Sequence, residues 1–190
     1  MKALEEDREL VRRAKDGDLP SFDLLVVRHH RSVINLIYRF TGDFQGSEDL
    51  AQETFLRAFR GLRRFKERCA FFTWLYRITF SVCQNHRRSL FRNRAVSLDE
   101  AVETGLNHPR TESAEAEFQR KSLSAAVHEA VTSLPEEQRA PLILCRYQDL
   151  SYEEAAEILK ISLPALKSRI HRARLTLKEK LAPFFDGGDE

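Results

Sequence analysis

Apolar residues in the first half of the chain recur at the three- and four-residue spacing of a helix face, with polar residues between them. This pattern predicts four helices with short connections, which would pack as one small bundle. Ser21 and Ser47 stand where the second and third helices should begin, so each is expected to cap its helix. The expected ranges are Leu4–Ala14, Ser21 to Gly42, Ser47–Phe65 and Phe71–Leu90.

The last third of the chain carries a second helical pattern with stronger start signals. A helix near Leu123–Leu134 is followed by two copies of the capping-box pattern S-x-x-E, at Ser133–Glu136 and Ser151–Glu154. The second box opens a short helix, residues 160–162 form a turn, and a longer basic helix runs to Leu181. A short helix, a tight turn and a longer basic helix are the elements of a helix-turn-helix.

Between these two patterns the composition changes. Residues 92–118 hold three basic against six acidic residues, and we expect an acidic linker with at most a short helix near Leu98–Val102. Only 7 glycines and 6 prolines occur in 190 residues, which disfavours a sheet with many tight turns. The expected fold is therefore all-α, with two small helical domains at 1–92 and 118–185 and the linker at 93–117.

The net charge of +2 hides an uneven distribution. Residues 1–91 carry 17 Lys and Arg against 12 Asp and Glu, and Lys160–Lys180 carries seven basic residues and one acidic residue. Two basic regions on either side of an acidic stretch indicate nucleic-acid binding rather than a uniformly charged, merely soluble surface.

The residues that hold metals and cofactors in other proteins lack the necessary spacing here. Cys69, Cys83 and Cys145 are far apart without a C-x-x-C pair, and the six histidines show no ligand spacing with them. We expect reduced, apolar packing cysteines, no metal and no cofactor. The N-terminus is charged from Lys2 and no apolar run approaches ~18 residues, so we expect no signal peptide, no membrane insertion and a cytoplasmic location.

The last helix is the most informative motif. If Leu166, Ile170 and Ala173 face the core, the opposite side is basic and suits the major groove of DNA. The alternative is an ordinary solvated basic surface. The capped helix directly before it favours DNA binding. The outward side would present Lys167, Ser168, His171 and Arg172, flanked by Arg169 and Arg174.

The helix that starts near Ser47 has a polar side that begins with Glu48 and Asp49. Residue chemistry by itself favours an ordinary solvated face there, with helical charge pairs such as Glu53–Arg57. A protein-binding role for this face therefore needs support from outside the motif.

The helix over Phe71–Leu90 carries Trp74 and Arg77 on the side away from its core positions, together with amide side chains. Aromatic rings beside guanidinium and amide groups suit unstacked bases, which need a stacking surface and edge donors. Trp74 and Tyr76 could equally be core or boundary aromatics, and residue chemistry does not choose between the two.

These motifs occur together and in a fixed order. The segments SEDLAQETFLRAFRGLRRF and AFFTWLYRI resemble region 2 of sigma factors, and LPEEQRAPLILCRYQDLSYEEAAEILKIS and LKSRIHRARLTLKEKL resemble region 4. The resemblance covers about residues 10–92 and 120–182. Two such regions joined by a short linker are the plan of the extracytoplasmic-function (ECF) group of the sigma-70 family, which implies an alternative sigma factor and not an enzyme.

The resemblance implies a role for each motif. The polar helix would dock on the coiled coil of the β′ subunit of core RNA polymerase, with further contacts to β. The loop Lys66–Ala70 and the following helix would melt the minus-10 element of promoter DNA and hold a flipped base, and the last helix would read the minus-35 element. An anti-sigma factor is also implied. The residues so implied are Glu48, Asp49, Gln52, Glu53 and Phe55 for polymerase; Lys66, Arg68, Trp74, Arg77, Ser81, Gln84, Asn85 and Arg88 for the minus-10 element; and Lys160, Ser162, Lys167, Ser168, Arg169, His171, Arg172 and Arg174 for the minus-35 element.

Three departures from the family pattern leave the promoter preference open. Lys160 stands where the family often has glycine, and a left-handed lysine there would cost roughly 1 kcal/mol. Ser81 replaces a common asparagine in the melting helix. The recognition helix begins Ser-Leu-Pro-Ala-Leu instead of the commoner Val-Gly-Thr-Val pattern.

Other functions account for less of the sequence. A stand-alone helix-turn-helix regulator would need only the C-terminal part and leaves the Asp49–Phe55 face and the Trp74 segment unexplained. A Mg²⁺-dependent nuclease could use Glu48, Asp49 and Glu53, but these carboxylates share one helix with no partner carboxylates in sequence reach. A purely structural interaction module does not account for the basic last helix.

Overall fold

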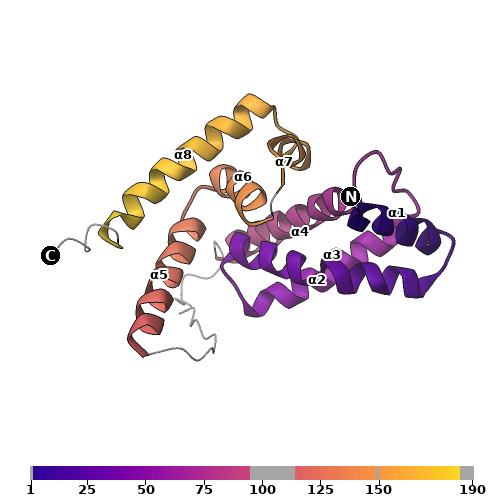
Figure 1. Ribbon diagram of the computed structural model, residues 1–190, viewed down its shortest axis with the longest axis horizontal. Helices are drawn as coiled ribbons and strands as arrows, with labels where there is room; N and C mark the ends of the chain where they lie inside the picture. Colours follow the sequence, from indigo (N-terminus) through magenta and orange to yellow (C-terminus); the bar gives the residue numbers. More distant parts are fainter. Residues whose placement is uncertain (1, 95–113, 149, 185–190) are drawn as a thin grey trace.

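The computed structural model describes residues 2–94, 114–148 and 150–184, and side chains for 5–90, 123–148 and 150–184. Every regular element in these ranges is a helix, and the helices form two modules (Figure 1). The expected all-α fold with two helical modules is therefore confirmed.

The first four helices make the N-terminal bundle. Each is amphipathic and buries its apolar stripe against the others. Phe40, Leu62 and Leu75 are at most 2% exposed in its centre, and the rings of Phe40 and Phe80 meet edge to face at 5.1 Å. The bounds are α1 (Lys2–Lys15), α2 (Leu19–Thr41), α3 (Gln45–Leu62) and α4 (Phe71–Arg94).

The predicted cap of α2 at Ser21 is wrong. The helix begins at Leu19, because Asp18 precedes it in an extended conformation and Pro20 occupies its first turn. Ser21 is buried inside that turn, where its hydroxyl donates to the Asp18 carboxylate at 2.7 Å. The other end is as predicted: Gly42 adopts φ 82° and donates its N–H to the chain one turn earlier.

The predicted cap of α3 at Ser47 is also wrong. The helix begins two residues earlier, at Gln45. Ser47 is buried and its hydroxyl donates to the carbonyl of Asp43, while the Asp43 carboxylate accepts the N–H of Gly46 at 3.0 Å. Asp43 thus satisfies the first turn in place of the serine.

The remaining helices make the C-terminal module, in which α6 packs against both α7 and α8. Its centre is formed by Ile143 and Leu144 of α6 and Leu166 of α8, none of which is exposed. The bounds are α5 (Ala114–Thr132), α6 (Glu136–Tyr147), α7 (Tyr152–Leu159), α8 (Leu163–Leu181) and the short 3-10 helix η1 (Ala182–Phe184).

One of the two predicted capping boxes forms. The Ser151 hydroxyl accepts the N–H of Glu154 at 3.1 Å, and the Glu154 carboxylate accepts the N–H of Ser151 at 2.9 Å. The box predicted at Ser133 is wrong, because the Ser133 hydroxyl donates to the Ala130 carbonyl at 2.8 Å. Glu136, its expected partner, instead accepts hydrogen bonds from α4 of the N-terminal bundle.

The turn of the helix-turn-helix forms at residues 160–162, as predicted. Lys160 is left-handed, with φ 55° and ψ 45°, so the anticipated strain is present. Ser162 ends the turn by accepting the N–H of Ala165 at 3.4 Å, which caps α8.

Helix α5 begins at Ala114, inside the segment that was expected to be linker. The short helix expected near Leu98–Val102 lies outside the described residues. The division of the chain at 93–117 therefore stays a prediction.

The two modules pack against each other, a contact that the sequence did not predict. Helix α2 touches α5 and α6, and α4 touches α7 (Figure 1). The rings of Tyr38 and His128 stack at 4.3 Å, and the Arg39 guanidinium lies 3.8 Å from the ring centroid of Tyr147. This packing decides which faces of each module reach solvent.

Candidate nucleic-acid and protein interfaces

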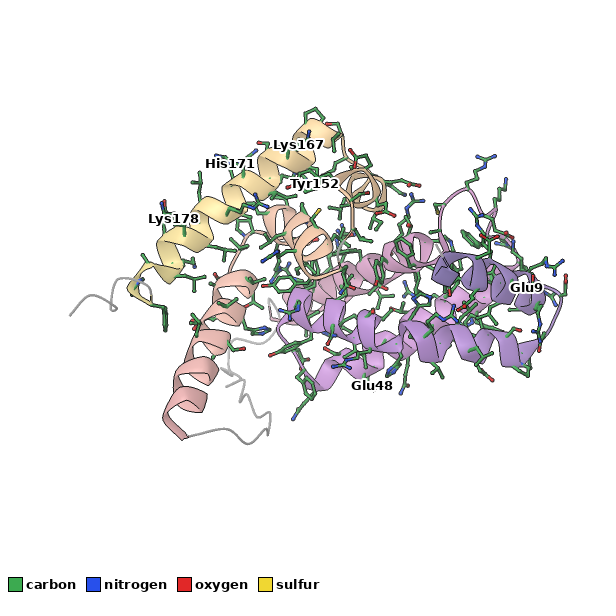
Figure 2. All side chains as sticks on the ribbon, in the orientation of Figure 1. Glu9, Glu48, Tyr152, Lys167, His171 and Lys178 are labelled. Atoms are coloured by element: carbon green, nitrogen blue, oxygen red, sulfur yellow. The ribbon has the colours of Figure 1, made fainter. Side chains whose placement is uncertain are left out.

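Helix α8 presents a basic side to solvent. Leu166, Ile170 and Ala173 are at most 3% exposed and hold the helix on the module's core. Lys167 and His171 project from its outer edge, together with other exposed polar side chains (Figure 2). The outward residues of the predicted set are Lys160, Ser162, Lys167, Ser168, His171, Arg172 and Arg174.

Two contacts organise this basic side. The Arg172 guanidinium donates to the Ser168 hydroxyl, one turn earlier, at 3.1 Å. Arg169 is half-buried and pairs with Glu137 of α6 at 3.5 Å, so it lies nearer the module than the other predicted residues. The exposed cations on one helix match the shape and charge of a duplex groove.

The polar side of α3 is largely exposed, at Glu48, Asp49 and Gln52. Glu48 lies 3.1 Å from His30, and Glu53 accepts a hydrogen bond from Arg57 at 2.6 Å. Two of the three carboxylates considered for a Mg²⁺ site therefore have basic partners.

Phe55 does not belong to this exposed side. It is 7% exposed, lies in the core of the bundle and stacks beside His30, with ring centroids 6.2 Å apart. The apolar side chains that do reach solvent on α3 are Leu56 and Phe59, at 43% and 44% exposure. Sequence reasoning missed both, although each is a large apolar residue off the core stripe, which was the available signal.

The loop between α3 and α4 exposes Lys66 and Arg68. Glu67, between them, has φ 54° and pairs with Lys15 of α1, which ties the loop to the bundle. Trp74 behind the loop is half-buried and stacks on Phe65, with ring centroids 4.7 Å apart. Trp74 is thus a boundary aromatic, packed on one side by the bundle.

The other predicted minus-10 residues lie on α4, where some are exposed and others are paired with the C-terminal module. Ser81, Asn85 and Arg88 are exposed. Arg77 pairs with Glu157 of α7, and Gln84 donates to Glu136 of α6 at 2.9 Å. Part of the predicted DNA-binding side is therefore covered by the C-terminal module.

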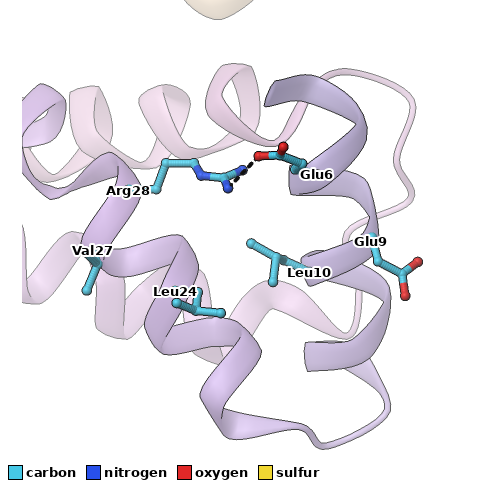
Figure 3. A pocket seen from close by; sticks show the side chains of 6 residues that line it. All are labelled: Glu6, Glu9, Leu10, Leu24, Val27 and Arg28. Carbon is cyan, nitrogen blue, oxygen red and sulfur yellow. Dashed lines mark hydrogen bonds and ion pairs between the residues drawn. The ribbon is translucent and has the colours of Figure 1, made fainter. Parts of the chain in front are cut away.

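An open groove lies between α1 and α2, away from these surfaces. Leu24 and Val27 line it and are 55% and 76% exposed (Figure 3). Its polar residues are Glu6, which pairs with Arg28 at 2.9 Å, and Glu9. The groove therefore combines exposed apolar side chains with a charged edge.

Comparison with known proteins supplies the family. Residues 25–93 match the model for Sigma-70 region 2, and residues 124–177 match the model for Sigma-70, region 4. The RNA polymerase sigma-H factor of Pseudomonas aeruginosa is 36% identical over 94% of this chain and 95% of its own length. The ECF RNA polymerase sigma-E factor of Haemophilus influenzae is 31% identical over 93% of this chain and 96% of its own.

The chain belongs to the ECF group of the sigma-70 family. It is a sigma factor, which is a transcription initiation factor and not an enzyme. The acidic side of α3 and the predicted minus-10 residues fall within region 2, and the basic side of α8 falls almost wholly within region 4.

Solved structures agree with this assignment. The structure of CnrH in complex with the cytosolic domain of CnrY covers 97% of this chain. The match takes in 99% of the matched chain in that structure, with a TM-score of 0.67 and 26% identity. The sigma factor RpoE of Bartonella quintana, in complex with the anti-sigma factor NepR, has a TM-score of 0.71 over 85% of this chain and 96% of its own. At 24% identity, the second match supports the fold alone.

The cysteines of the sigma factor have the environment of packing residues. Burial raises the pKa of the Cys83 thiol to about 12 and that of Cys145 to about 11, which disfavours the reactive thiolate. Across the side chains that the structure describes, no three His, Cys, Asp or Glu residues gather as metal ligands would. Within the described helices, none is long and apolar enough to cross a membrane.

Proposed function

We propose that the sigma factor binds core RNA polymerase through α3, opens the minus-10 element with the α3–α4 loop and α4, and reads the minus-35 element with α8. The observation that carries this proposal is the pair of exposed, chemically distinct surfaces in one chain. One is the polar side of α3 at Asp49 and Gln52, and the other is the basic side of α8 around His171 and Arg172. A regulator that binds DNA by itself needs only the second surface.

The exposed residues of α3 suit a protein partner. Asp49, Gln52, Leu56 and Phe59 are spaced by three or four residues, so they share one side of the helix. Polar residues give such a contact its orientation, and exposed leucine and phenylalanine supply apolar area. We infer that the coiled coil of the β′ subunit docks there, and that region 4 contacts the β subunit.

The loop with Lys66 and Arg68 suits a single DNA strand. Its cations are exposed next to the Phe65–Trp74 stack, and exposed Asn85 and Arg88 continue the surface along α4. Extracting a base from a duplex costs a few kcal/mol, which a polar pocket with cationic walls offsets. We infer that the minus-10 strand follows this route.

Helix α8 would read the minus-35 element as a duplex. Arg172 and Lys167 can reach guanine acceptors in the major groove, while Lys160 and Arg174 at the flanks can neutralise phosphates. Because Ser168 already orients the Arg172 guanidinium, Arg172 is the residue most suited to a specific base contact.

We further propose that an anti-sigma factor controls this protein in the cytoplasm. The proposal rests on the two solved relatives described above, which are complexes with CnrY and with the anti-sigma factor NepR. The exposed apolar side chains on α3 are a surface that such a partner would cover in competition with polymerase.

Transcription in vitro with core polymerase and a genomic promoter library tests the proposed function. Replacing Asp49 and Gln52 together by alanine should abolish transcription at every promoter, because docking precedes promoter choice. Arg172→Ala should instead weaken transcription in a sequence-dependent way, by about 1–3 kcal/mol at promoters with the contacted base.

Two controls make this test specific. Asp23→Ala removes an exposed carboxylate from α2, and Lys178→Ala removes an exposed cation from the far end of α8. Both should leave transcription nearly unchanged. A tight, sequence-specific footprint by the protein without polymerase would contradict the proposal and support a stand-alone regulator.

A further inference from the structure

We propose that Lys15 of α1 is a positioning residue for base selection at the minus-10 element. By pairing with Glu67, it holds the α3–α4 loop (residues 63–70) in the form that accepts one unstacked base. This role rests on the proposed function of the loop and adds a residue from a different helix to it. The sequence gave no sign of the role, because the two partners are 52 residues apart along the chain.

The α3–α4 loop receives little support from its own backbone. Its backbone hydrogen bonds lie at the two ends, where Arg64 and Phe65 donate to the last turn of α3 and Trp74 donates to the carbonyl of Ala70. In the part of the chain that the structure describes, residues 66–69 make no hydrogen bond of this kind. The middle of the loop therefore depends on side chains for its conformation.

Glu67 lies in this middle segment and has a left-handed φ of 54°. A side chain disfavours that conformation, so it persists where surrounding contacts impose it, and such residues gather at functional sites. The contact that Glu67 makes is the ion pair with the Lys15 ammonium. Because Lys66 and Arg68 flank Glu67 and are both exposed, the pair fixes the backbone from which the two cations project.

Lys15 is itself held in place on the bundle. Val11, one turn earlier on α1, is 1% exposed, and the Lys15 side chain keeps only 22% of its surface exposed. Its ammonium lies 5.5 Å from the ring centroid of Phe65, which in turn stacks on Trp74. One ammonium therefore joins the carboxylate of the loop to the aromatic cluster behind it.

The pair also neutralises a charge that would oppose DNA binding. An unpaired Glu67 carboxylate between two cations would repel the phosphates that those cations attract. An ordinary exposed ion pair on a rigid surface contributes little to stability and nothing to DNA recognition. This pair is partly buried and ties down a loop with few other restraints, so its loss should change base selection more than stability.

Binding of single strands to the holoenzyme tests this role with the variant Lys15→Met. Labelled oligonucleotides carry the minus-10 element of a promoter identified by transcription in vitro, with each base substituted in turn. Fluorescence anisotropy gives the ratio of the affinities for the native and the substituted base. At the captured base this ratio should fall about threefold to tenfold in the variant, the size expected for one lost, partly buried, charge-assisted contact.

Transcription from two templates separates base capture from docking and folding. On the duplex promoter, Lys15→Met should lower transcription by a similar factor. On a template whose minus-10 element is already unpaired, transcription should return to nearly the wild-type level, because the cost of extracting the base is removed. An equal loss on both templates would assign Lys15 to polymerase binding or folding and would overturn the proposed role.

Three further variants make the test specific. Lys15→Arg keeps the charge and should retain base selection. Glu67→Gln should lower the ratio of affinities although it raises the affinity for every oligonucleotide, since a negative charge is lost. Arg12→Met removes an exposed cation that pairs with Glu9 within α1, and it should change neither quantity. Circular dichroism verifies that all variants retain their helices.

Alkylation of Cys69 reports the order of the loop without DNA or polymerase. Cys69 lies in the loop and is half-buried, and mass spectrometry of the alkylated free chain gives its labelling rate. The rate should rise about threefold to tenfold in Lys15→Met, by the same loss of one ion pair, and stay unchanged in Lys15→Arg.

The outcomes keep the role of Lys15 distinct from the function of the loop. If Lys15→Met keeps the base selection or the Cys69 labelling rate of the wild type, the role is wrong. Faster labelling of Lys15→Met, together with a wild-type protein that selects no base, would uphold the anchoring of the loop and contradict the proposed function instead.

Discussion

Lys160 is a strained residue in the turn that positions α8. Its left-handed backbone turns the chain from α7 into α8 within three residues. A side chain in this conformation crowds the following carbonyl, and glycine does not. The lysine is exposed, so it gains no packing in return.

Lys160→Gly should therefore raise the free energy of unfolding by about 0.5–1 kcal/mol, since the relief of strain exceeds the added entropy of the unfolded chain. Urea denaturation followed by circular dichroism measures the change. Lys160→Ala is the control, because it removes the charge and keeps the strain. Equal stability of the glycine and alanine variants would contradict this account.

Asp7 is the most deeply buried carboxylate among the described side chains of the bundle, at 4% exposure. It lies 2.8 Å from His29 and accepts from Arg28 at 2.7 Å, which fastens α1 to α2. Burial by itself would raise the pKa of Asp7, but the hydrogen bonds and charges of His29 and Arg28 outweigh it and lower that pKa below its usual 3.8.

Asp7→Asn should lower the free energy of unfolding at neutral pH by about 1–3 kcal/mol, because His29 and Arg28 lose a charged, buried acceptor. The stability that the ionised carboxylate contributes is fully present above pH 3.8 and is lost as the pH falls through the lowered folded pKa. Denaturation at several pH values measures this, and the gap between the variant and the wild type should narrow below that point. A gap that stays constant to pH 2.5 would exclude ionisation of Asp7 as its cause.

At the scale of elements, the S-x-x-E pattern occurs twice, and only one copy caps a helix. Ser151 caps α7, a helix of 8 residues, by bonding reciprocally with Glu154. Ser133 bonds instead to the end of α5, and its expected partner has turned to the other module. The same pattern thus has two structural outcomes in one chain.

Ser151→Ala should lower the free energy of unfolding by about 1 kcal/mol, the usual cost of a lost N-cap. Because Ser133 does not cap a helix, Ser133→Ala should cost less than half of that in the same urea experiment. Equal losses would show that the cap of α7 adds nothing beyond an ordinary serine hydrogen bond.

At the scale of the whole molecule, His128 lies in the contact between the two modules. It lies on α5 and stacks on Tyr38 of α2, next to Arg39. Burial and the Arg39 charge lower the pKa of His128 below its usual 6.5, while a hydrogen bond with the Gly42 backbone acts in the opposite direction.

Since the closed arrangement favours the neutral imidazole, protonation should weaken the contact between α2 and α5. The stabilisation is complete above pH 6.5 and declines as the pH falls below it. Scattering between pH 7.5 and 5.5 should show the radius of gyration increase in the wild type, and a His128→Gln variant should respond less. An identical response in both proteins would assign the pH effect to other groups.

Local signals predicted the elements well where local chemistry decides them. The box at Ser151, the turn at residues 160–162 and the stop at Gly42 depend on neighbours within one turn of helix, and all three are confirmed. The caps at Ser21 and Ser47 were wrong because both helices begin earlier. The Ser21 hydroxyl donates to Asp18, and in α3 the Asp43 carboxylate accepts a first-turn N–H.

The sequence by itself determined the helices, the basic side of α8 and the resemblance to the sigma-70 family, because helical periodicity, caps and charge are properties of neighbouring residues. Only the tertiary structure decided that Leu56 and Phe59 are exposed, and that glutamates of the other module cover Arg77 and Gln84. Burial and contacts between modules depend on residues far apart along the chain. In this sigma factor, such contacts set which parts of the predicted DNA-binding side are exposed.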